Sequence, residues 1–188
     1  MSVHSRRSPR GDQRAMLDIA AEVLIADPRA SLADVAAAAG VGRTTLHKRY
    51  PTREALLIAI GRDSMDRIEE AIAGADIANS ADAAALRRLL GALIPLGPRL
   101  TFLIRHAADE LDDALMSRVE TLDVPVEDLI LRAQKEQTIR SGVPVWWVVS
   151  ILYSLAYSAW EAVAAGRLAV LDAPALAFDT LISGIGPS

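Results

Sequence analysis

The stretch from Ser31 to Leu56, SLADVAAAAGVGRTTLHKRYPTREAL, constrains the fold more than any other part of the sequence. Ser31 is followed three residues later by Asp34, a capping-box pattern that predicts the start of a helix. Gly40 then stands where a helix commonly ends in a left-handed residue. Between them, apolar residues recur at helical spacing on one face: Leu32, Val35, Ala36 and Ala39. The pattern predicts a short helix that ends in a tight turn.

A second short helix is expected directly after Gly42. Leu46 and Tyr50 lie four residues apart and would form its inner face, Pro51 would stop it, and Thr52 could cap the next helix. The remaining side chains are mostly hydrogen-bond donors: Arg43, Thr44, Thr45, His47, Lys48 and Arg49. Two short helices joined by a tight turn containing glycine, the second rich in donors, are typical of a helix-turn-helix.

The segment AGVGRTTLHKRYPTREALL resembles the DNA-binding region of the tetracycline-repressor (TetR) family of bacterial regulators. That region typically reads A-G-V-S-x-x-T-L-Y-x-[HY]-F-x-x-[KR]-E-x-L. Here Gly42 replaces the usual Ser, His47 the usual Tyr, and Tyr50 the usual Phe. The matching residues are Ala39, Gly40, Val41, Thr45, Leu46, Arg53, Glu54 and Leu56. The resemblance implies a protein that binds duplex DNA through this segment.

Charge is distributed unevenly along the chain. Residues 1–53 carry nine Lys/Arg and five Asp/Glu, a net charge of +4, whereas residues 54–188 carry eleven and nineteen, a net charge of −8. A basic N-terminal part on an acidic remainder indicates that only the N-terminal part meets a polyanion, although chance variation in surface charge would look the same. We expect Arg43 and Thr44 to read bases, and the residues that mainly contact phosphates to be Thr45, His47, Lys48 and Arg53.

Helices are expected in every other segment, because no run alternates with period two for long enough to form a strand. The expected ranges are 12–26, 53–74, 81–93, 99–107, 109–121, 124–140, 144–165 and 173–185. We therefore predict an all-α protein, with an N-terminal arm and three-helix helix-turn-helix domain over residues 1–53 and a helical effector-binding and dimerisation domain over residues 54–188. In the arm, Arg6, Arg7 and Arg10 are either disordered or reach along the DNA.

The segment from Ser141 to Trp160 contains no charged residue, and its length would suit a membrane span. Gly142 and Pro144 at its start, then Ser150, Ser154 and Ser158, and the lack of a basic cluster instead favour a helix buried in a soluble protein. The TetR resemblance implies that the last two long helices pair with those of a second subunit in a four-helix bundle. The small residues expected at this dimer interface are Ser154, Ser158, Ala162 and Ala165.

Five of the chain's eight aromatic residues lie in this same helix, and four of them share one face. Effector sites in helical proteins are mostly apolar clefts with a few polar groups, which Tyr and Trp suit. The alternative is that these rings only fill the core. The residues predicted to bind an effector are Phe102, His106, Trp146, Tyr153, Tyr157 and Trp160. We expect a flat, apolar or weakly polar molecule, and Asp109 and Glu110 slightly favour a cation.

Catalytic and metal chemistry have little support in the sequence. The three histidines form no Ser/His/Asp set by spacing, and Gly40-x-Gly42 lacks the third glycine of a dinucleotide fingerprint and follows a helix. His106, Glu110 and Asp113 could hold a divalent ion only on one unbroken helix, and a solvated acidic face is favoured. We expect no enzyme activity, no cofactor and no bound metal. The absence of cysteine and of an apolar leader agrees with a cytoplasmic protein.

These observations together predict a homodimeric, ligand-responsive transcriptional regulator, most simply a repressor. Its partners would be a palindromic operator and a small-molecule effector that changes the spacing of the two recognition helices. The alternative, from a different class, is an all-α small-molecule-binding or enzymatic module in which the helix-turn-helix is only structural. Binding to duplex DNA separates the two.

Overall fold

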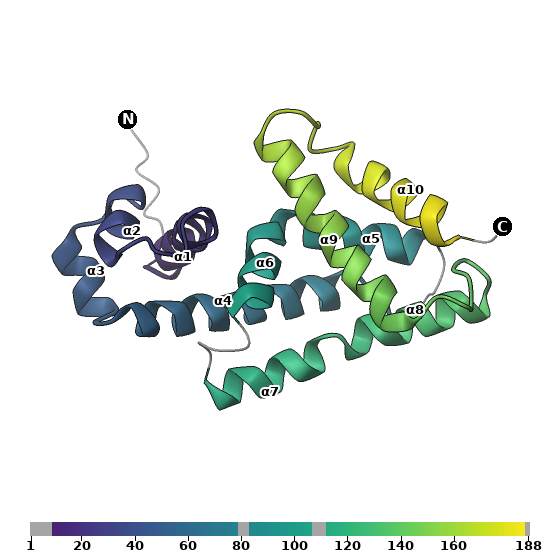
Figure 1. Cartoon of the computed structure of the whole chain (residues 1–188), viewed down its shortest axis with the longest axis horizontal. Helices are drawn as coiled ribbons and strands as arrows, with labels where there is room; N and C mark the ends of the chain where they lie inside the picture. The colour runs from purple at the N-terminus through teal and green to yellow at the C-terminus, as the bar shows by residue number, and fades with distance from the viewer. Residues whose placement is uncertain (1–8, 79–82, 107–111, 187–188) are drawn as a thin grey trace, which may run out of the picture.

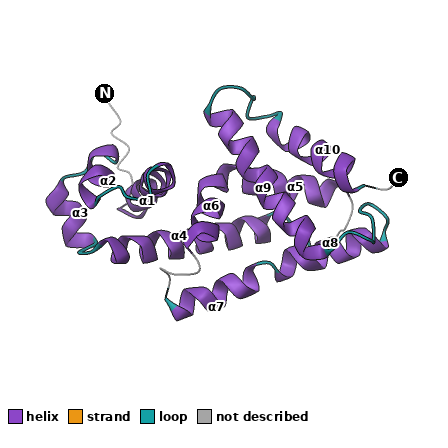
Figure 2. Ribbon diagram, viewed as in Figure 1, coloured by secondary structure: helices purple, strands orange, loops and turns teal. Residues whose placement is uncertain are grey.

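The computed structural model describes residues 9–78, 83–106 and 112–186, and within these ranges it contains helices and no strand (Figures 1 and 2). The predicted all-α fold is confirmed. The helices are α1 (Pro9–Ala26), α2 (Leu32–Ala38), α3 (Arg43–Arg49), α4 (Arg53–Gly74), α5 (Ala83–Leu93), the short 3-10 helix η1 (Ile94–Leu96), α6 (Gly97–His106), α7 (Asp113–Leu122), α8 (Val124–Lys135), α9 (Val145–Ala164) and α10 (Ala173–Ile185).

Helices α1, α2 and α3 form a small head at one end of the molecule (Figure 1). The capping box of α2 is present, since the Ser31 hydroxyl accepts from the Asp34 amide at 3.3 Å and the Asp34 carboxylate accepts from the Ser31 amide at 2.8 Å. Gly40 has φ +64°, the left-handed conformation that the turn requires. The Thr52 hydroxyl caps α4 by accepting from the Ala55 amide at 3.0 Å. Arg6 and Arg7 and the side chain of Arg10 lie outside the described residues.

Helix α4 joins the head to the body, the part of the protein formed by α5–α10 (Figure 1). The buried α4 residues of the head's core are Leu56, Leu57 and Ile60, whereas those of the body's core are Met65, Ile68 and Ile72. Phe102 of α6 also belongs to the head's core. The predicted boundary at residue 53 is the first residue of α4, so the packing of the head continues beyond it. Helices α4 and α6 each contribute to both cores.

Two helix ends in the body differ from the sequence prediction. Helix α8 ends at Lys135 rather than residue 140, because Gln137 adopts φ +59° and the Thr138 amide donates back to the Ala133 carbonyl at 2.9 Å. Helix α7 begins only after Asp112, which is extended and caps the helix by accepting from the Leu115 amide at 2.9 Å. Short polar side chains and a left-handed residue therefore interrupt patterns that otherwise read as continuous helix.

Gly97 permits the close approach of α6 to α9. A Cβ atom at this position would lie 2.8 Å from Cβ of Trp160 and 3.3 Å from the backbone Cα of Tyr157. Gly97→Ala should therefore lower the free energy of unfolding by about 1–3 kcal/mol, because neither contact is the end of a flexible side chain. Urea denaturation checks this, with Gly74→Ala as control, since a Cβ there meets nothing within 4 Å. Equal midpoints for the two variants would contradict the prediction.

Candidate functional site

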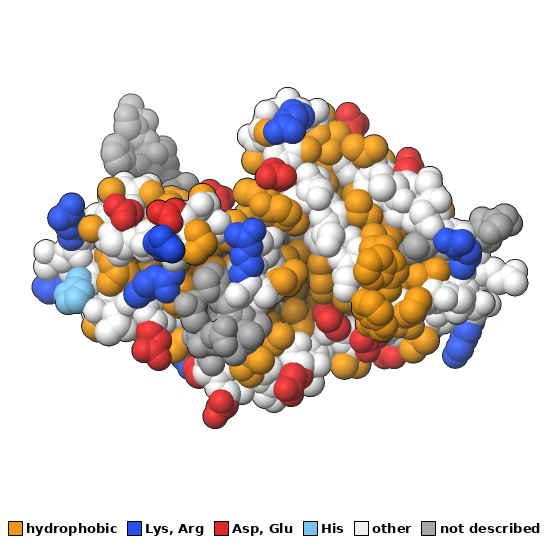
Figure 3. Space-filling view, viewed as in Figure 1, with side chains coloured by type: hydrophobic (Ala, Val, Ile, Leu, Met, Phe, Trp, Pro, Cys, Tyr) orange, Lys and Arg blue, Asp and Glu red, His pale blue; other side chains and the backbone are white. Residues whose placement is uncertain are grey.

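Helix α3 presents a polar surface at the outer end of the head. Its buried anchor is Leu46, which is 2% exposed, and Tyr50 just after the helix is 5% exposed. The side chains predicted to contact DNA from this helix are all exposed: Arg43, Thr44, Thr45, His47 and Lys48. Basic side chains gather at this end of the molecule (Figure 3). A short helix whose donors all face solvent has the form of a helix that reads the major groove.

Contacts to neighbouring elements hold α3 in place. The Tyr50 hydroxyl accepts from the side-chain amide of Gln13 in α1 at 3.3 Å, and the Arg49 guanidinium donates to the carbonyl oxygen of the same Gln13 side chain. Arg53, a predicted phosphate contact, donates to the Pro28 carbonyl at 2.8 Å and thereby ties α4 to the α1–α2 turn. Gly42 caps α3 without a side-chain hydrogen bond. Arg49 and Arg53 therefore have structural contacts in the head, which the sequence did not indicate.

A cavity of about 420 Å³ opens in the body between α6, α7, α8 and α9. A larger hollow of about 800 Å³ beside the α8–α9 turn is a shallow basin lined by polar residues such as Gln134 and Arg140, and is less suited to an apolar molecule. The lining of the smaller cavity is mainly apolar and includes two carboxylates. Its residues are Leu100, Leu103, Ile104, Val119, Leu122, Asp123, Glu127, Trp146, Val149, Ser150, Tyr153 and Ser154.

The polar groups of this cavity lie at the start of α8 and on the facing side of α9. The Tyr153 hydroxyl donates to the Asp123 carboxylate at 2.6 Å, and burial, more than this carboxylate, raises the pKa of Tyr153 well above its usual value. Glu127 follows Asp123 by four residues, so both carboxylates share one flank of α8. No described lining residue is Lys or Arg. The described lining therefore combines an aromatic wall with two carboxylates and no basic side chain.

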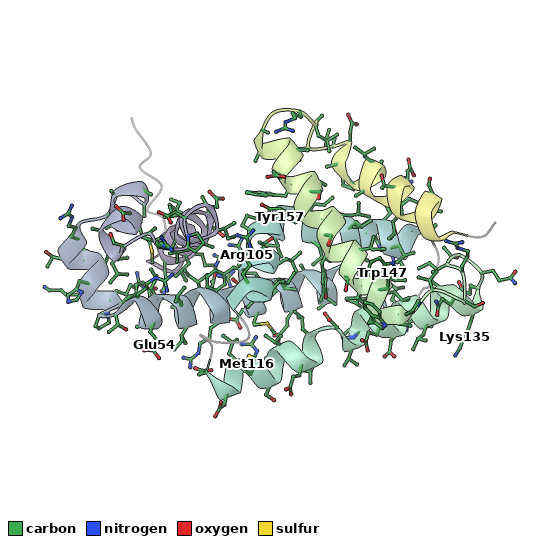
Figure 4. The ribbon with its side chains drawn as sticks, in the orientation of Figure 1. Glu54, Arg105, Met116, Lys135, Trp147 and Tyr157 are labelled. Atoms are coloured by element: carbon green, nitrogen blue, oxygen red, sulfur yellow. The ribbon has the colours of Figure 1, made fainter. Side chains whose placement is uncertain are left out.

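The structure separates the residues predicted to bind an effector. Trp146 and Tyr153 line the cavity together. Tyr157 and Trp160 do not; they stack on each other with ring centroids 5.7 Å apart, and their backbone and Cβ atoms lie against α6 at Gly97. Figure 4 shows Tyr157 further along α9 than Trp147, beyond the stretch that borders the cavity. The aromatic face of α9 therefore contacts two different places: Trp146 and Tyr153 border the cavity, whereas Tyr157 and Trp160 lie against α6.

Helix α6 is rotated differently from what the sequence suggested. Phe102 is fully buried in the head's core and does not reach the cavity, which α6 lines instead with Leu100, Leu103 and Ile104. The side chain of His106, and Asp109 and Glu110, lie outside the described residues. The sequence analysis did not identify the α6 leucines or Asp123 as lining residues. Asp123 and Glu127 could have been found, because two carboxylates four residues apart lie on the same face of a helix.

The unbroken helix on which the disfavoured metal alternative depended is not formed. Asp112 is extended, so His106 at the end of α6 and Asp113 at the start of α7 do not belong to one helix. Among the described residues, no group of three His, Cys, Asp or Glu side chains is placed to hold a metal ion. Asp112 instead forms an ion pair with Arg62 of α4.

The small-residue stripe predicted for a dimer lies on the outer side of α9. Ser154, Ser158 and Ala165 are exposed and Ala162 is half-buried, while Ser154 also borders the cavity. The Ser154 hydroxyl donates to the Ser150 carbonyl at 2.8 Å, and the Ser150 hydroxyl donates to the Trp146 carbonyl at 2.9 Å. Because the helix itself accepts these two hydroxyl protons, Ser150 and Ser154 could be covered without leaving their donors unpaired.

Both the head and the whole chain are similar to known bacterial transcriptional regulators. Residues 16–60 match the model of the family described as bacterial regulatory proteins, tetR family. The HTH-type transcriptional repressor LfrR of Mycolicibacterium smegmatis is 35% identical over 175 residues, which cover 92% of this chain and 89% of that protein. The HTH-type transcriptional regulator NfxB of Pseudomonas aeruginosa is 27% identical over 164 residues, covering 84% of this chain and 85% of that one.

Solved structures match the fold of this chain over nearly its whole length. The crystal structure of the TetR-like regulator LfrR from Mycobacterium smegmatis in complex with proflavine matches with a TM-score of 0.68 at 31% identity, covering 94% of this chain and 98% of that chain. A second crystal structure of LfrR matches with a TM-score of 0.71 at 31% identity, covering 95% and 98%. The head, the long connecting helix and the helical body described above are thus a shared arrangement.

Proposed function

The chain belongs to the TetR family of bacterial regulatory proteins and is a DNA-binding transcriptional regulator, and we propose that it is a homodimeric repressor that a small molecule releases from a palindromic operator. Its curated relatives are named transcriptional regulators, so the alternative of an enzymatic module with a merely structural helix-turn-helix is set aside. The observation that supports the proposal best is the pairing of an exposed, donor-rich α3 with a mainly apolar cavity in the body.

Helix α3 would enter the major groove. Arg43 and Thr44 stand at its N-terminal end, which in helix-turn-helix proteins faces the base edges, so we assign them to base reading. Thr45, His47 and Lys48 would contact phosphates. His47 and Lys48 also lie in the last turn of α3, where positive charge interacts favourably with the helix dipole. Arg53 would join them from the start of α4, where its guanidinium also donates to the Pro28 carbonyl.

The effector proposed for the cavity is a flat aromatic cation. Trp146 and Tyr153 supply aromatic surface, and Asp123 and Glu127 supply negative charge that no described basic residue of the lining balances. A cation in such a site gains from both the rings and the carboxylates. Proflavine, which is bound in the related LfrR structure, is a planar aromatic cation of this kind. A volume of about 420 Å³ is in the range of pockets for small ligands.

A homodimer through α9 and α10 would cover the apolar surface that one chain leaves open. The most apolar 18-residue window of Val145–Ala164 has a mean hydropathy of 1.2, and only 33% of it is buried. By length and composition this helix could also span a membrane. Membership of a family of DNA-binding regulators favours the dimer, and a cytoplasmic location beside the DNA. Apolar side chains crowd the surface over α9 (Figure 3).

The test of this function measures both binding of the protein to DNA and its release from DNA by an effector. The purified protein is used to select duplexes from a random library, and fluorescence anisotropy then measures binding of a selected duplex with and without proflavine. We expect a palindromic sequence to be enriched and proflavine to weaken its binding. Proflavine can itself stack in duplex DNA, so the cavity variant described next supplies the baseline. No enrichment above random sequence would contradict the DNA-binding assignment of α3.

Asp123→Asn should weaken proflavine binding by about 1.5–3 kcal/mol, because it removes a charge next to the ligand while its amide oxygen still accepts from Tyr153. Quenching of tryptophan fluorescence measures this affinity. The control is Asp128→Asn, which removes the same charge from an exposed position of α8 outside the cavity. Trp146→Phe should abolish most of the quenching and Trp160→Phe little of it. Equal affinities of the two Asp variants would place the ligand elsewhere.

A further inference from the structure

Helix α6 faces the cavity on one side and the head on the other. Leu100 and Ile104 line the cavity, whereas Phe102 is fully buried in the head's core. The Arg105 guanidinium lies between α6 and α1 and donates to the Ile25 carbonyl at 3.2 Å (Figure 4). A displacement of α6 by a molecule in the cavity would therefore act directly on the packing of α1.

One buried ionic cluster connects α6 to both α1 and α4. The Arg99 side chain is 2% exposed, and its Nη2 atom lies 2.9 Å from the Asp18 carboxylate of α1 and 2.7 Å from the Asp63 carboxylate of α4. Its Nε atom donates to the same Asp18 oxygen at 3.1 Å, and Nη1 donates to the Ser64 hydroxyl at 3.3 Å. A single guanidinium thus holds three helices together.

The charges of this cluster depend on each other. Burial lowers the pKa of Arg99, and the Asp18 and Asp63 carboxylates oppose that shift; the guanidinium nevertheless stays protonated. Burial likewise raises the pKa of Asp63, with Arg99 the main opposing charge. A buried guanidinium without any partner is strongly destabilising, so a displacement of Arg99 is expected to draw Asp18 and Asp63 with it. The cluster therefore connects α6 to α1 and α4 through one buried charge.

We propose that Arg99 transmits effector occupancy from the cavity to the DNA-binding head. Its neighbour Leu100 is part of the cavity wall, so a ligand that displaces Leu100 moves the backbone that carries the guanidinium. Asp18 then moves α1, and α1 carries α2 and α3 with it because the three share one apolar core. This inference rests on the proposed release by an effector in the same cavity, and it assigns the transmission to the α6–α1 contact.

The variant that isolates this contact is Asp18→Asn. It removes the charge that Arg99 meets on α1, but leaves Asp63 and Ser64 to satisfy the buried guanidinium, and Asp18 is itself 40% exposed, so the fold should persist. The matched control is Arg67→Gln, because Arg67 of α4 contacts the same Asp18 oxygen at 2.6 Å without involving α6. Arg99→Lys is the second variant, since it keeps the charge but loses the fork that reaches both carboxylates.

The measured quantity is the factor by which proflavine weakens binding to the selected duplex, at a concentration that saturates the wild type but leaves Asp123→Asn mostly empty, so that this variant gives the baseline. Couplings of this kind range from about 5-fold to 150-fold. We expect a factor in that range for the wild type and for Arg67→Gln, and at most about twofold for Asp18→Asn and Arg99→Lys. Proflavine affinity, read from tryptophan quenching, should stay within about threefold of wild type in all four proteins. Hydrogen exchange should show proflavine-dependent changes in α1 of the wild type that are absent in Asp18→Asn.

Three results would overturn the proposal. Release of Asp18→Asn and Arg99→Lys with the wild-type factor would place the transmission elsewhere while leaving the proposed function intact. Loss of proflavine binding itself in either variant would make the cluster part of the cavity's structure and not a connection. A wild type that binds proflavine in the cavity and keeps its DNA would overturn both the proposed release and the role of Arg99.

Discussion

Ser158→Glu is expected to convert the protein from a dimer to a monomer and to weaken operator binding by about 10²–10⁴-fold, because each head would then bind its half-site alone. Ser158 is exposed on α9 in the stripe proposed to face the second subunit. A carboxylate placed there would be desolvated on both copies at once, since a two-fold interface repeats every contact. The monomer itself should fold normally, because the position is exposed in one chain.

Ser117→Glu is the matched control for this dimer variant. It introduces the same side chain at an exposed serine on α7, away from α9 and α10. Light scattering at micromolar concentration should give the mass of a dimer for the wild type and the control, and of a monomer for Ser158→Glu. Circular dichroism should show equal helix content in all three. A monomeric wild type, or a Ser158→Glu variant that remains dimeric, would remove the α9 stripe from the interface.

The argument for this interface combines composition with exposure. Trp147 on α9 and Leu176 on α10 are 48% and 55% exposed, and α9 packs against α10 within the chain (Figure 1). Large apolar side chains left uncovered on two adjacent helices, next to serines whose hydroxyls bond to their own helix, are suited to close contact with another apolar helix pair. A palindromic operator would match the two-fold symmetry of such a dimer.

The parts of the fold that the sequence predicted correctly are those set by local interactions. Ser31 and Asp34 define the start of α2, Gly40 the turn, and Thr52 the start of α4, because each acts on backbone groups within a few residues. The same local logic failed at the end of α8, where the apolar pattern continues but Gln137 adopts a left-handed conformation. The spacing of apolar residues alone does not show where such a helix ends.

The cavity could be predicted only in outline, because its position depends on which helices face one another. A helical wheel showed that Trp146, Tyr153, Tyr157 and Trp160 share a face, but not that the last two lie against α6 at Gly97. The position of Phe102 could not be predicted for the same reason. The packing of α6 on the head sets the rotation of this helix and thereby places Phe102 in the head's core.

The Arg99 cluster lay beyond local reasoning altogether. Asp18 is 81 residues away along the chain and Asp63 is 36 residues away. No spacing rule connects such partners, and an arginine in an amphipathic helix reads as a surface residue unless the packing is known. Its burial is therefore a consequence of tertiary structure, where α1, α4 and α6 meet.

Arg43→Ala and Lys48→Ala should weaken DNA binding in two distinguishable ways. Arg43→Ala removes a base contact, so it should cost about 1–3 kcal/mol per half-site on the selected operator and relax the sequence preference there. Lys48→Ala removes a phosphate contact, so it should weaken all duplexes alike. It should also reduce the log–log salt slope by about 0.9 for each phosphate, and so by about 1.8 in a symmetrical dimer.

The control for both α3 variants is Lys135→Ala, which changes the net charge equally at the end of α8 that lies far from the head (Figure 4). If only overall charge mattered, all three variants would lose affinity and salt dependence to the same extent. Contact through α3 instead requires Lys135→Ala to bind like the wild type, while Arg43→Ala loses discrimination and Lys48→Ala keeps it. Anisotropy titrations of the operator and a scrambled duplex at several salt concentrations separate these outcomes. Wild-type behaviour of both α3 variants would move the DNA contact to another surface, whereas loss of discrimination in Arg43→Ala alone identifies the base-reading end of the helix.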